Sequence, residues 1–143
     1  MASIASAANT YVLHTVNGSD TNSSMYKWNR DMRDIAYQLK GSTADETVNN
    51  TWEYVWYNME YSFYYKPRDM KNTWTEMKGD CTDGSYMIQK LLRYDMIYSS
   101  TVHGWCYNAN NSRIKHDWLE YRGRVIDSTN YCYKYVKISS GVW

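Results

Sequence analysis

Apolar positions between residues 25 and 59 recur at helical spacing in two separate segments. The first pattern stops just before Gly41, as expected of an amphipathic helix followed by a glycine. The second segment opens with Thr43-Ala-Asp-Glu46, a capping-box sequence that predicts a helix start. We expect this helix to run into the aromatic stretch 61–65 and to end before Pro67. The apolar positions are Met25, Trp28, Met32, Ile35, Ala36 and Leu39 in the first segment, and Val48, Trp52, Val55, Trp56 and Met59 in the second.

A third helical pattern follows the segment Met77-Lys-Gly-Asp80. Asp80 is a good N-cap, because its carboxylate can accept a hydrogen bond from a free amide of the first turn. Asp83, three residues on, adds a second carboxylate where the helix dipole favours negative charge. Met87, Ile88, Leu91 and Leu92 then recur at helical spacing. The pattern therefore places Cys81 in the first turn of a buried helix.

After this helix the patterning is typical of β-strands. We predict strands at 98–107, 114–121 and 125–129, with the last two joined by a tight turn at Arg122-Gly123. A further short strand is predicted at 11–16, before a polar loop at 17–24.

Composition changes this picture in two ways. The net charge of +1 gives no reason to expect a nucleic acid or an anionic membrane surface as partner. The 7 Trp, 16 Tyr and 8 Met residues supply apolar area where branched aliphatic residues are few. We therefore expect a folded domain with an aromatic core.

Domain organisation follows from the length of 143 residues, which suits one domain. No apolar run is long enough for a membrane span, and the first residues lack the basic and apolar regions of a signal peptide. We expect a soluble monomer, with residues 1–20 as an N-terminal segment or the end of a linker. Residues 21–143 would form the domain.

Three cysteines are too few for a disulfide framework, and their odd number leaves at least one thiol free. We interpret Cys106 and Cys132 as small buried residues. Cys81 differs, because a core cysteine has no reason to follow Gly-Asp at a helix start. The helix dipole favours its thiolate, but the two flanking acids oppose this, so a histidine is needed as activator.

Among His14, His103 and His116, the last has a carboxylate within reach. A two-residue turn at 122–123 makes Tyr121 face Arg124. Asp127 then lies diagonal to His116 on the same face of the sheet, close enough for a hydrogen bond. A turn with an odd number of residues would place the two side chains on opposite faces. His14 lies far from other candidate chemistry, and His103 could be a structural residue.

These motifs, taken in order, resemble the transglutaminase-like superfamily, which is related to papain. The resemblance covers about residues 43–130 and is carried by Lys78-Gly-Asp-Cys81-Thr-Asp-Gly84, Leu91-Leu-Arg93, His116-Asp-Trp-Leu-Glu120 and Asp127-Ser-Thr129. It implies an α+β fold in which helices pack on an antiparallel sheet. It also implies a Cys81-His116-Asp127 triad.

Within this superfamily, the small size and the Tyr- and Asn-rich composition are most similar to the catalytic domains of pseudomurein endoisopeptidases of methanogen viruses and proviruses. This resemblance implies a cysteine peptidase that cuts an isopeptide bond in the peptide of the archaeal cell wall, its expected partner. Asp117, where the family usually has a small residue, and Asp95-Met-Ile97, where Gly-Ile-Pro is common, depart from the pattern. Both departures bear on substrate choice.

The implied reaction is acyl transfer through a thioester. His116 would take the proton of Cys81, and Asp127 would orient and stabilise the imidazolium. The backbone N–H of Cys81 and one side-chain donor would hold the oxyanion. The candidates for that donor are Trp74, Tyr61 and Trp56, from the stretch before the triad.

Three alternatives remain open at this point. An amine instead of water could resolve the thioester, which would make the protein a transglutaminase. The domain could also be a wall-binding module without catalysis. No cofactor is needed for the chemistry and no metal site is assigned, although Asp80, Asp83 and Asp117 could serve as oxygen ligands of Ca²⁺.

Overall fold

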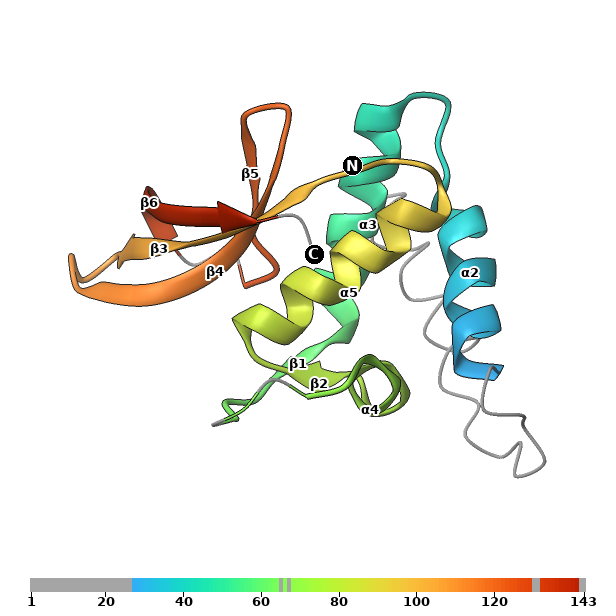
Figure 1. The fold of residues 1–143 in the computed structure, drawn as a ribbon, viewed down its shortest axis with the longest axis horizontal. Coiled ribbons are helices and arrows are strands. Elements are labelled where there is room, and N and C mark those ends of the chain that lie inside the picture. The colour runs from blue at the N-terminus through green and yellow to red at the C-terminus, as the bar shows by residue number, and fades with distance from the viewer. Residues whose placement is uncertain (1–26, 65, 67, 130–131, 142–143) are drawn as a thin grey trace.

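A computed structural model describes residues 27–64, 66, 68–129 and 132–141. Helices fill most of the first two thirds of this part of the chain, and strands fill the last third (Figure 1). The helices are α2 (Lys27–Leu39), α3 (Ala44–Asn58), α4 (Met70–Glu76) and α5 (Cys81–Tyr94). The strands are β1 (Glu60–Tyr61), β2 (Lys78–Gly79), β3 (Ser100–Asn108), β4 (Arg113–Tyr121), β5 (Arg124–Ile126) and β6 (Cys132–Gly141). The predicted α+β class is confirmed.

The last four strands form one antiparallel sheet in the order β5-β4-β3-β6. The chain therefore crosses from one edge of the sheet to the other between β5 and β6. The two short strands β1 and β2 pair in parallel and join the end of α3 to the residues before α5. The sheet curls away from the helices, and α5 lies between the sheet and α2 (Figure 1).

Helix α5 is the centre of the hydrophobic core. Its buried apolar face carries the predicted residues Met87, Ile88, Leu91 and Leu92, each with no exposed surface. This face packs against α2, α3 and α4, and the helix also contacts β4. Burying a side chain of this size contributes about 1.5–3 kcal/mol, so the four residues fix α5 firmly relative to the sheet. The N-terminal end of α5 is therefore held in place by its own core face.

The predicted helices are present, with one boundary that differs. Thr43 is the N-cap of α3, and its hydroxyl accepts the Glu46 amide at 3.1 Å. The helix ends at Asn58 and does not run into the aromatic stretch, so the prediction of a helix through 61–65 was wrong. Met59 is already extended, and Glu60 pairs with Lys78 instead. Helical spacing continued past the true end because a parallel strand pair overrides the local preference.

Besides the short strands β1 and β2, two elements were not predicted from the sequence. Helix α4 is short and begins at Asp69, whose carboxylate accepts the Asn72 amide at 2.8 Å. Strand β6 covers the C-terminal residues and pairs with β3, with irregularities in its register. The predicted strand at 11–16 lies outside the described residues, as does the proposed segment 1–20.

Cys106 and Cys132 form a disulfide, which the interpretation of both as small buried residues did not include. The two residues are 26 positions apart in sequence, and their Cα atoms are 5.8 Å apart. Strands β3 and β6 are neighbours, and a register shift after Tyr107 brings the two side chains together. Because β6 was not predicted, the sequence offered no reason to pair them. Cys81 is the free cysteine of the described chain.

Replacing Cys106 with serine should lower the free energy of unfolding by about 3.5 kcal/mol. This value follows from the loss of a cross-link that closes a loop of 26 residues. Thermal unfolding without reductant measures it, and Cys132→Ser should give the same loss. Adding reductant should bring the wild type to the level of the variants and leave the variants unchanged. A wild type as unstable as Cys106→Ser under oxidising conditions would contradict the cross-link.

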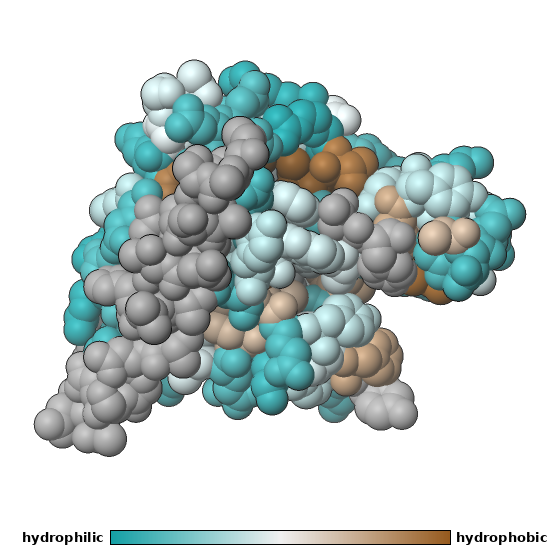
Figure 2. All heavy atoms as spheres, turned by 180° about the vertical axis from the view of Figure 1, so that it is seen from behind, coloured by the Kyte–Doolittle hydropathy of each residue, from teal (hydrophilic) through white to brown (hydrophobic). Residues whose placement is uncertain are grey.

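Among the helices that the structure describes, none combines the length and the apolar composition that a membrane crossing requires. Seen from behind, the surface is largely hydrophilic, and hydrophobic side chains appear in separate patches (Figure 2).

Candidate active site

Cys81 is the first residue of α5, as predicted. Asp80 caps the helix, and its carboxylate accepts the amides of Thr82 at 3.0 Å and Asp83 at 3.1 Å. The Asp83 carboxylate accepts the Asp80 amide at 3.1 Å and completes a capping box. These bonds fix the first turn without using the Cys81 side chain, which is partly exposed. The thiol is therefore free to react, while the backbone around it is rigid.

His116 and Asp127 come from one hairpin, and its register is the predicted one. Tyr121 pairs with Arg124, and both turn residues, Arg122 and Gly123, have positive φ angles of 48° and 78°. Such a turn matches the twist of a two-residue hairpin. Strand β5 is shorter than predicted, so Asp127 stands just past its end. The two side chains still meet on the same face.

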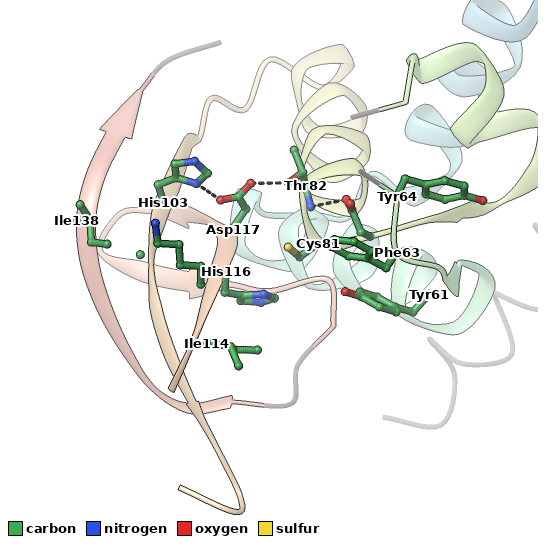
Figure 3. A pocket seen from close by; sticks show the side chains of 13 residues that line it. Tyr61, Phe63, Tyr64, Cys81, Thr82, His103, Ile114, His116, Asp117 and Ile138 are labelled. Atoms are coloured by element: carbon green, nitrogen blue, oxygen red, sulfur yellow. Dashed lines mark hydrogen bonds and ion pairs between the residues drawn. The ribbon is translucent and has the colours of Figure 1, made fainter. Parts of the chain in front are cut away.

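The His116 imidazole is held by the Asp127 carboxylate. Its Nε2 atom lies 2.9 Å from both Oδ1 and Oδ2, and both residues are almost fully buried. Nδ1 is then left for the thiol of Cys81, which contributes to the raised pKa of His116. The structure thus brings together all three predicted triad residues. Figure 3 shows the Cys81 sulfur and the His116 ring in one pocket.

Asp127 has partners that sequence reasoning did not identify. The Tyr135 hydroxyl of β6 donates to its Oδ2 atom at 2.7 Å. The amide and the hydroxyl of Thr129 donate to Oδ1 at 3.0 and 2.9 Å. The Trp52 indole N–H of α3 donates to the Asp127 backbone carbonyl at 2.6 Å. The carboxylate is therefore oriented from the loop after β5 and from the edge strand β6, while α3 holds the backbone of Asp127.

These contacts shift the pKa values of the pair in opposite directions. Burial by itself would lower the pKa of His116, but its bonds with Asp127 and Cys81 outweigh burial and raise that pKa to about 9. Burial would raise the pKa of Asp127, but donors from His116, Tyr135 and Thr129 overcome it and lower that pKa. At neutral pH the pair is an imidazolium held by a carboxylate.

The pair should make stability depend on pH. Protonated His116 stabilises the fold fully below its ordinary pKa of 6.5, and this contribution is lost as pH rises through about 9. We therefore expect the free energy of unfolding to fall between pH 7 and 10, as measured by denaturant titration. In Asp127→Ala this alkaline loss should shrink, because the partner that raises the pKa of His116 is gone. An identical pH dependence in both proteins would contradict the assignment.

Cys81 and His116 line a cleft of about 400 Å³. One wall is aromatic and comes from the segment after β1, and the other wall is the sheet (Figure 3). The lining residues include Tyr61, Phe63, Tyr64, Cys81, Thr82, His103, Ile114, Lys115, His116, Asp117 and Ile138. Tyr61, Phe63 and Ile138 are more than half exposed, at 52%, 69% and 58%. The thiol thus faces a groove with apolar rims.

The candidates for the oxyanion donor lie in different places. Tyr61 lines the cleft, whereas Trp74 is 1% exposed and packs against Tyr54 in the core. Trp56 stacks on Trp52, with ring centroids 6.0 Å apart. The spacing of aromatic residues along a helix does not show whether a tryptophan lies in the core or lines a cleft. The Cys81 amide, at the first position of α5, has no intrahelical partner and suits a developing oxyanion.

Asp117 is partly buried beside the triad. It accepts a hydrogen bond from the Thr82 hydroxyl and pairs with exposed His103 (Figure 3). This contact joins the start of α5 to strands β4 and β3. Asp117 directly follows His116, so its side chain lies on the opposite face of β4. Its contact with Thr82 depends on where α5 lies, which the sequence around Asp117 does not reveal.

The described residues contain one group of three side chains whose spacing would suit a bound metal ion. The sulfur atoms of Cys106 and Cys132 and one nitrogen of His116 all lie within 4.8 Å of one another. Both thiols are consumed in the disulfide, so the group offers no thiolate. The disulfide instead borders the triad and anchors the strand that carries Tyr135.

Comparisons with known proteins bear on the family and the fold. Residues 33–143 match the sequence profile of the transglutaminase-like superfamily. The crystal structure of a proposed cysteine protease from Cytophaga hutchinsonii is similar in fold, with a TM-score of 0.62 and 20% identity over 90% of this chain. The chain spans about half (50%) of that protein. A crystal structure of a TGase aligns with a TM-score of 0.48 and 16% identity, over 85% of this chain and 37% of the other. No curated protein sequence matches the chain.

Proposed function

Because the chain belongs to the transglutaminase-like superfamily, we propose that it is a cysteine peptidase that hydrolyses an amide or isopeptide bond in cell-wall peptide. The observation that carries this proposal is the Cys81 thiol beside His116, whose Nε2 atom is held by Asp127 at 2.9 Å. A thiol at a helix start with a buried imidazolium next to it suits acyl transfer.

The reaction proceeds in two halves. Cys81 reacts as the thiolate of a thiolate–imidazolium pair with His116, and its sulfur attacks the carbonyl carbon of the scissile amide. The oxyanion is held by the Cys81 amide, with Tyr61 as the side-chain candidate in the cleft. The imidazolium then protonates the leaving amine, and a thioester remains. His116 next takes a proton from water, whose oxygen attacks the thioester; the C–S bond breaks, the acid is released and the thiolate–imidazolium pair is restored.

Asp127 keeps the imidazole in the orientation that both halves need. Its carboxylate carries the charge that stabilises the imidazolium, and Tyr135 and Thr129 stabilise the carboxylate in turn. No step requires a metal. Asp80 and Asp83 use their oxygens to cap α5, and Asp117 accepts from Thr82, so we propose none of these residues as a Ca²⁺ ligand.

The substrate that we propose is pseudomurein peptide, cut by a monomer acting on the archaeal wall. This rests on the resemblance of the sequence to pseudomurein endoisopeptidases. It is supported by a groove whose rims, Tyr61, Phe63 and Ile138, are exposed and can contact an extended polymer. Cross-linking would need a shielded channel that excludes water and holds an amine. An open groove favours water as the acceptor.

Digestion of intact pseudomurein, with the released peptide ends identified by mass spectrometry, tests the proposal. We expect a free carboxyl and a free amine at a former isopeptide bond, and little incorporation of an added primary amine. Amine incorporation faster than hydrolysis would assign a transglutaminase instead. Iodoacetamide should stop the release of peptides. Wall binding that survives this treatment without any prior hydrolysis would favour a binding module.

A further inference from the structure

One face of the sheet carries a cluster of cations and aromatic rings on two successive rungs. On the first rung, Lys115 of β4 pairs with Trp105 of β3. On the second rung, Arg113 of β4 and Lys134 of β6 both pair with Tyr107 of β3. Directly paired residues project to the same side of a sheet. We call these five residues the basic face.

The rings of the basic face hold its cations. The Arg113 guanidinium lies 4.0 Å from the Trp105 ring centroid, and the Lys115 ammonium lies 5.6 Å from the same centroid. The Lys134 ammonium lies 5.1 Å from the Tyr107 centroid. Contacts of this kind restrict otherwise mobile side chains. The three positive charges are therefore gathered in fixed positions on an exposed surface.

The cations of the basic face form no ion pair within the described residues. Other cations do so, such as Lys137 with Glu120 at 2.9 Å. The acid of β4 on this side of the sheet, Asp117, is already engaged by His103 and Thr82. Three cations without a carboxylate repel one another, so an anionic ligand would be favoured here. This local excess contrasts with a net charge of only +1.

The basic face continues directly from the cleft. Lys115 belongs to both, because it also lines the cleft beside the neighbouring His116. Lys115 and Arg113 lie on the face of β4 opposite His116, and β5 pairs only with residues 119–121, so a substrate chain would reach Lys115 and then Arg113 by passing over the edge of β4. The spacing of about 6.8 Å between alternate residues of a strand equals that of alternate side chains in an extended peptide.

We infer that the basic face binds an acidic, extended peptide segment of the substrate, next to the amide that is cut. Side-chain or terminal carboxylates of that segment would pair with Arg113, Lys115 and Lys134. The inference rests on the proposed function only in taking the ligand as part of a peptide substrate. It adds a specificity determinant outside the triad, which selects substrates by their charge.

Binding without turnover tests this inference. The Cys81→Ala protein would be titrated against fluorescein-labelled hexaglutamate and hexaglutamine, with fluorescence anisotropy at low salt as the readout. We expect hexaglutamate to bind at least tenfold more tightly, and raising the salt concentration to remove most of the difference. Arg113→Glu and Lys134→Glu, each added to Cys81→Ala, should each lower the affinity for hexaglutamate about tenfold.

Arg122→Glu is the matched control. Arg122 also lies over an aromatic ring, that of Tyr121 at 5.2 Å, but it stands in the β4–β5 turn away from the basic face. Reversing the charge of Arg122 should change the affinity for hexaglutamate less than twofold. Equal affinity for the two peptides, equal losses in Arg122→Glu and Arg113→Glu, or tighter binding of a single-stranded DNA hexamer than of hexaglutamate would overturn the inference. Because no turnover is involved, failure here leaves the peptidase proposal standing.

A milder pair of variants guards against misfolding. Arg113→Gln and Lys134→Gln remove charge without reversing it, and both positions are exposed. Their melting temperatures should match that of the parent protein, while hexaglutamate affinity still falls. In the active protein, the same changes should raise KM for a substrate with an acidic extension and leave kcat unchanged. Unchanged hexaglutamate affinity in both folded glutamine variants would also overturn the inference.

Discussion

Replacing Cys81 with alanine should reduce peptide release by about 10⁴-fold or more, to background. In the proposed reaction the sulfur attacks the amide carbonyl, and no other thiol of the described chain is free to replace it. The fold should persist, because Asp80 and Asp83 cap α5 through backbone amides and the Cys81 side chain is partly exposed. Initial rates on wall peptide, together with circular dichroism, measure both expectations.

Thr82→Ala is a suitable control for the Cys81 variant. Thr82 follows Cys81 in the first turn and contacts Asp117 rather than the imidazole. It should keep activity within about tenfold of wild type, as a change that only perturbs positioning. If Cys81→Ala kept a tenth of the wild-type rate, Cys81 could not be the nucleophile. A collapse of the fold in that variant would show that the cap depends on the thiol.

Removing the carboxylate of Asp127 should lower kcat/KM by about 10⁴-fold. In Asp127→Ala the imidazole loses its partner at 2.9 Å, so its orientation is no longer fixed. The support that raises the pKa of His116 to about 9 is also lost, and burial then lowers that pKa. The alkaline limb of the pH–rate profile should therefore move to lower pH. Rates measured between pH 5 and 10 give both the loss and the shift.

Asp127→Asn separates the two contributions of the carboxylate. The amide oxygen can still accept from Nε2 but carries no charge, so this variant should lie between wild type and Asp127→Ala. Glu120→Ala is the control from the same hairpin, since Glu120 pairs with Lys137 on the surface and makes no triad contact. An Asp127→Ala variant that lost less than tenfold would remove Asp127 from the triad.

The central helix and the catalytic hairpin could be predicted from local signals. The cap at Asp80 and the apolar stripe through Leu92 determine where α5 starts and which side it buries. The turn at Arg122-Gly123 has two residues, so pairing in the hairpin follows by arithmetic. Both depend on neighbours within about a dozen residues, and short-range patterns capture such contacts.

The rest of the site depends on contacts between distant parts of the chain. Tyr135 reaches Asp127 only because β6 returns to the far edge of the sheet, and the Cys106–Cys132 disulfide depends on the same return. The alternation of side-chain types in β6 could have indicated a strand, but it does not indicate which strand β6 pairs with. Trp52 illustrates the same limit, because helical spacing places it on a buried stripe but does not reveal its bond to the Asp127 carbonyl.

The late position of β6 also has a consequence for protein synthesis. A ribosome delivers Cys81, His116 and Asp127 before the strand that carries Cys132 and Tyr135, and domains fold as their chain emerges. Until β6 has joined β3, the nascent chain lacks both the disulfide and the Tyr135 hydrogen bond. Cys81 is thus synthesised before all the contacts that orient His116 and Asp127 have formed. A ribosome-bound chain that stops at Thr129 should therefore be less active than the full chain.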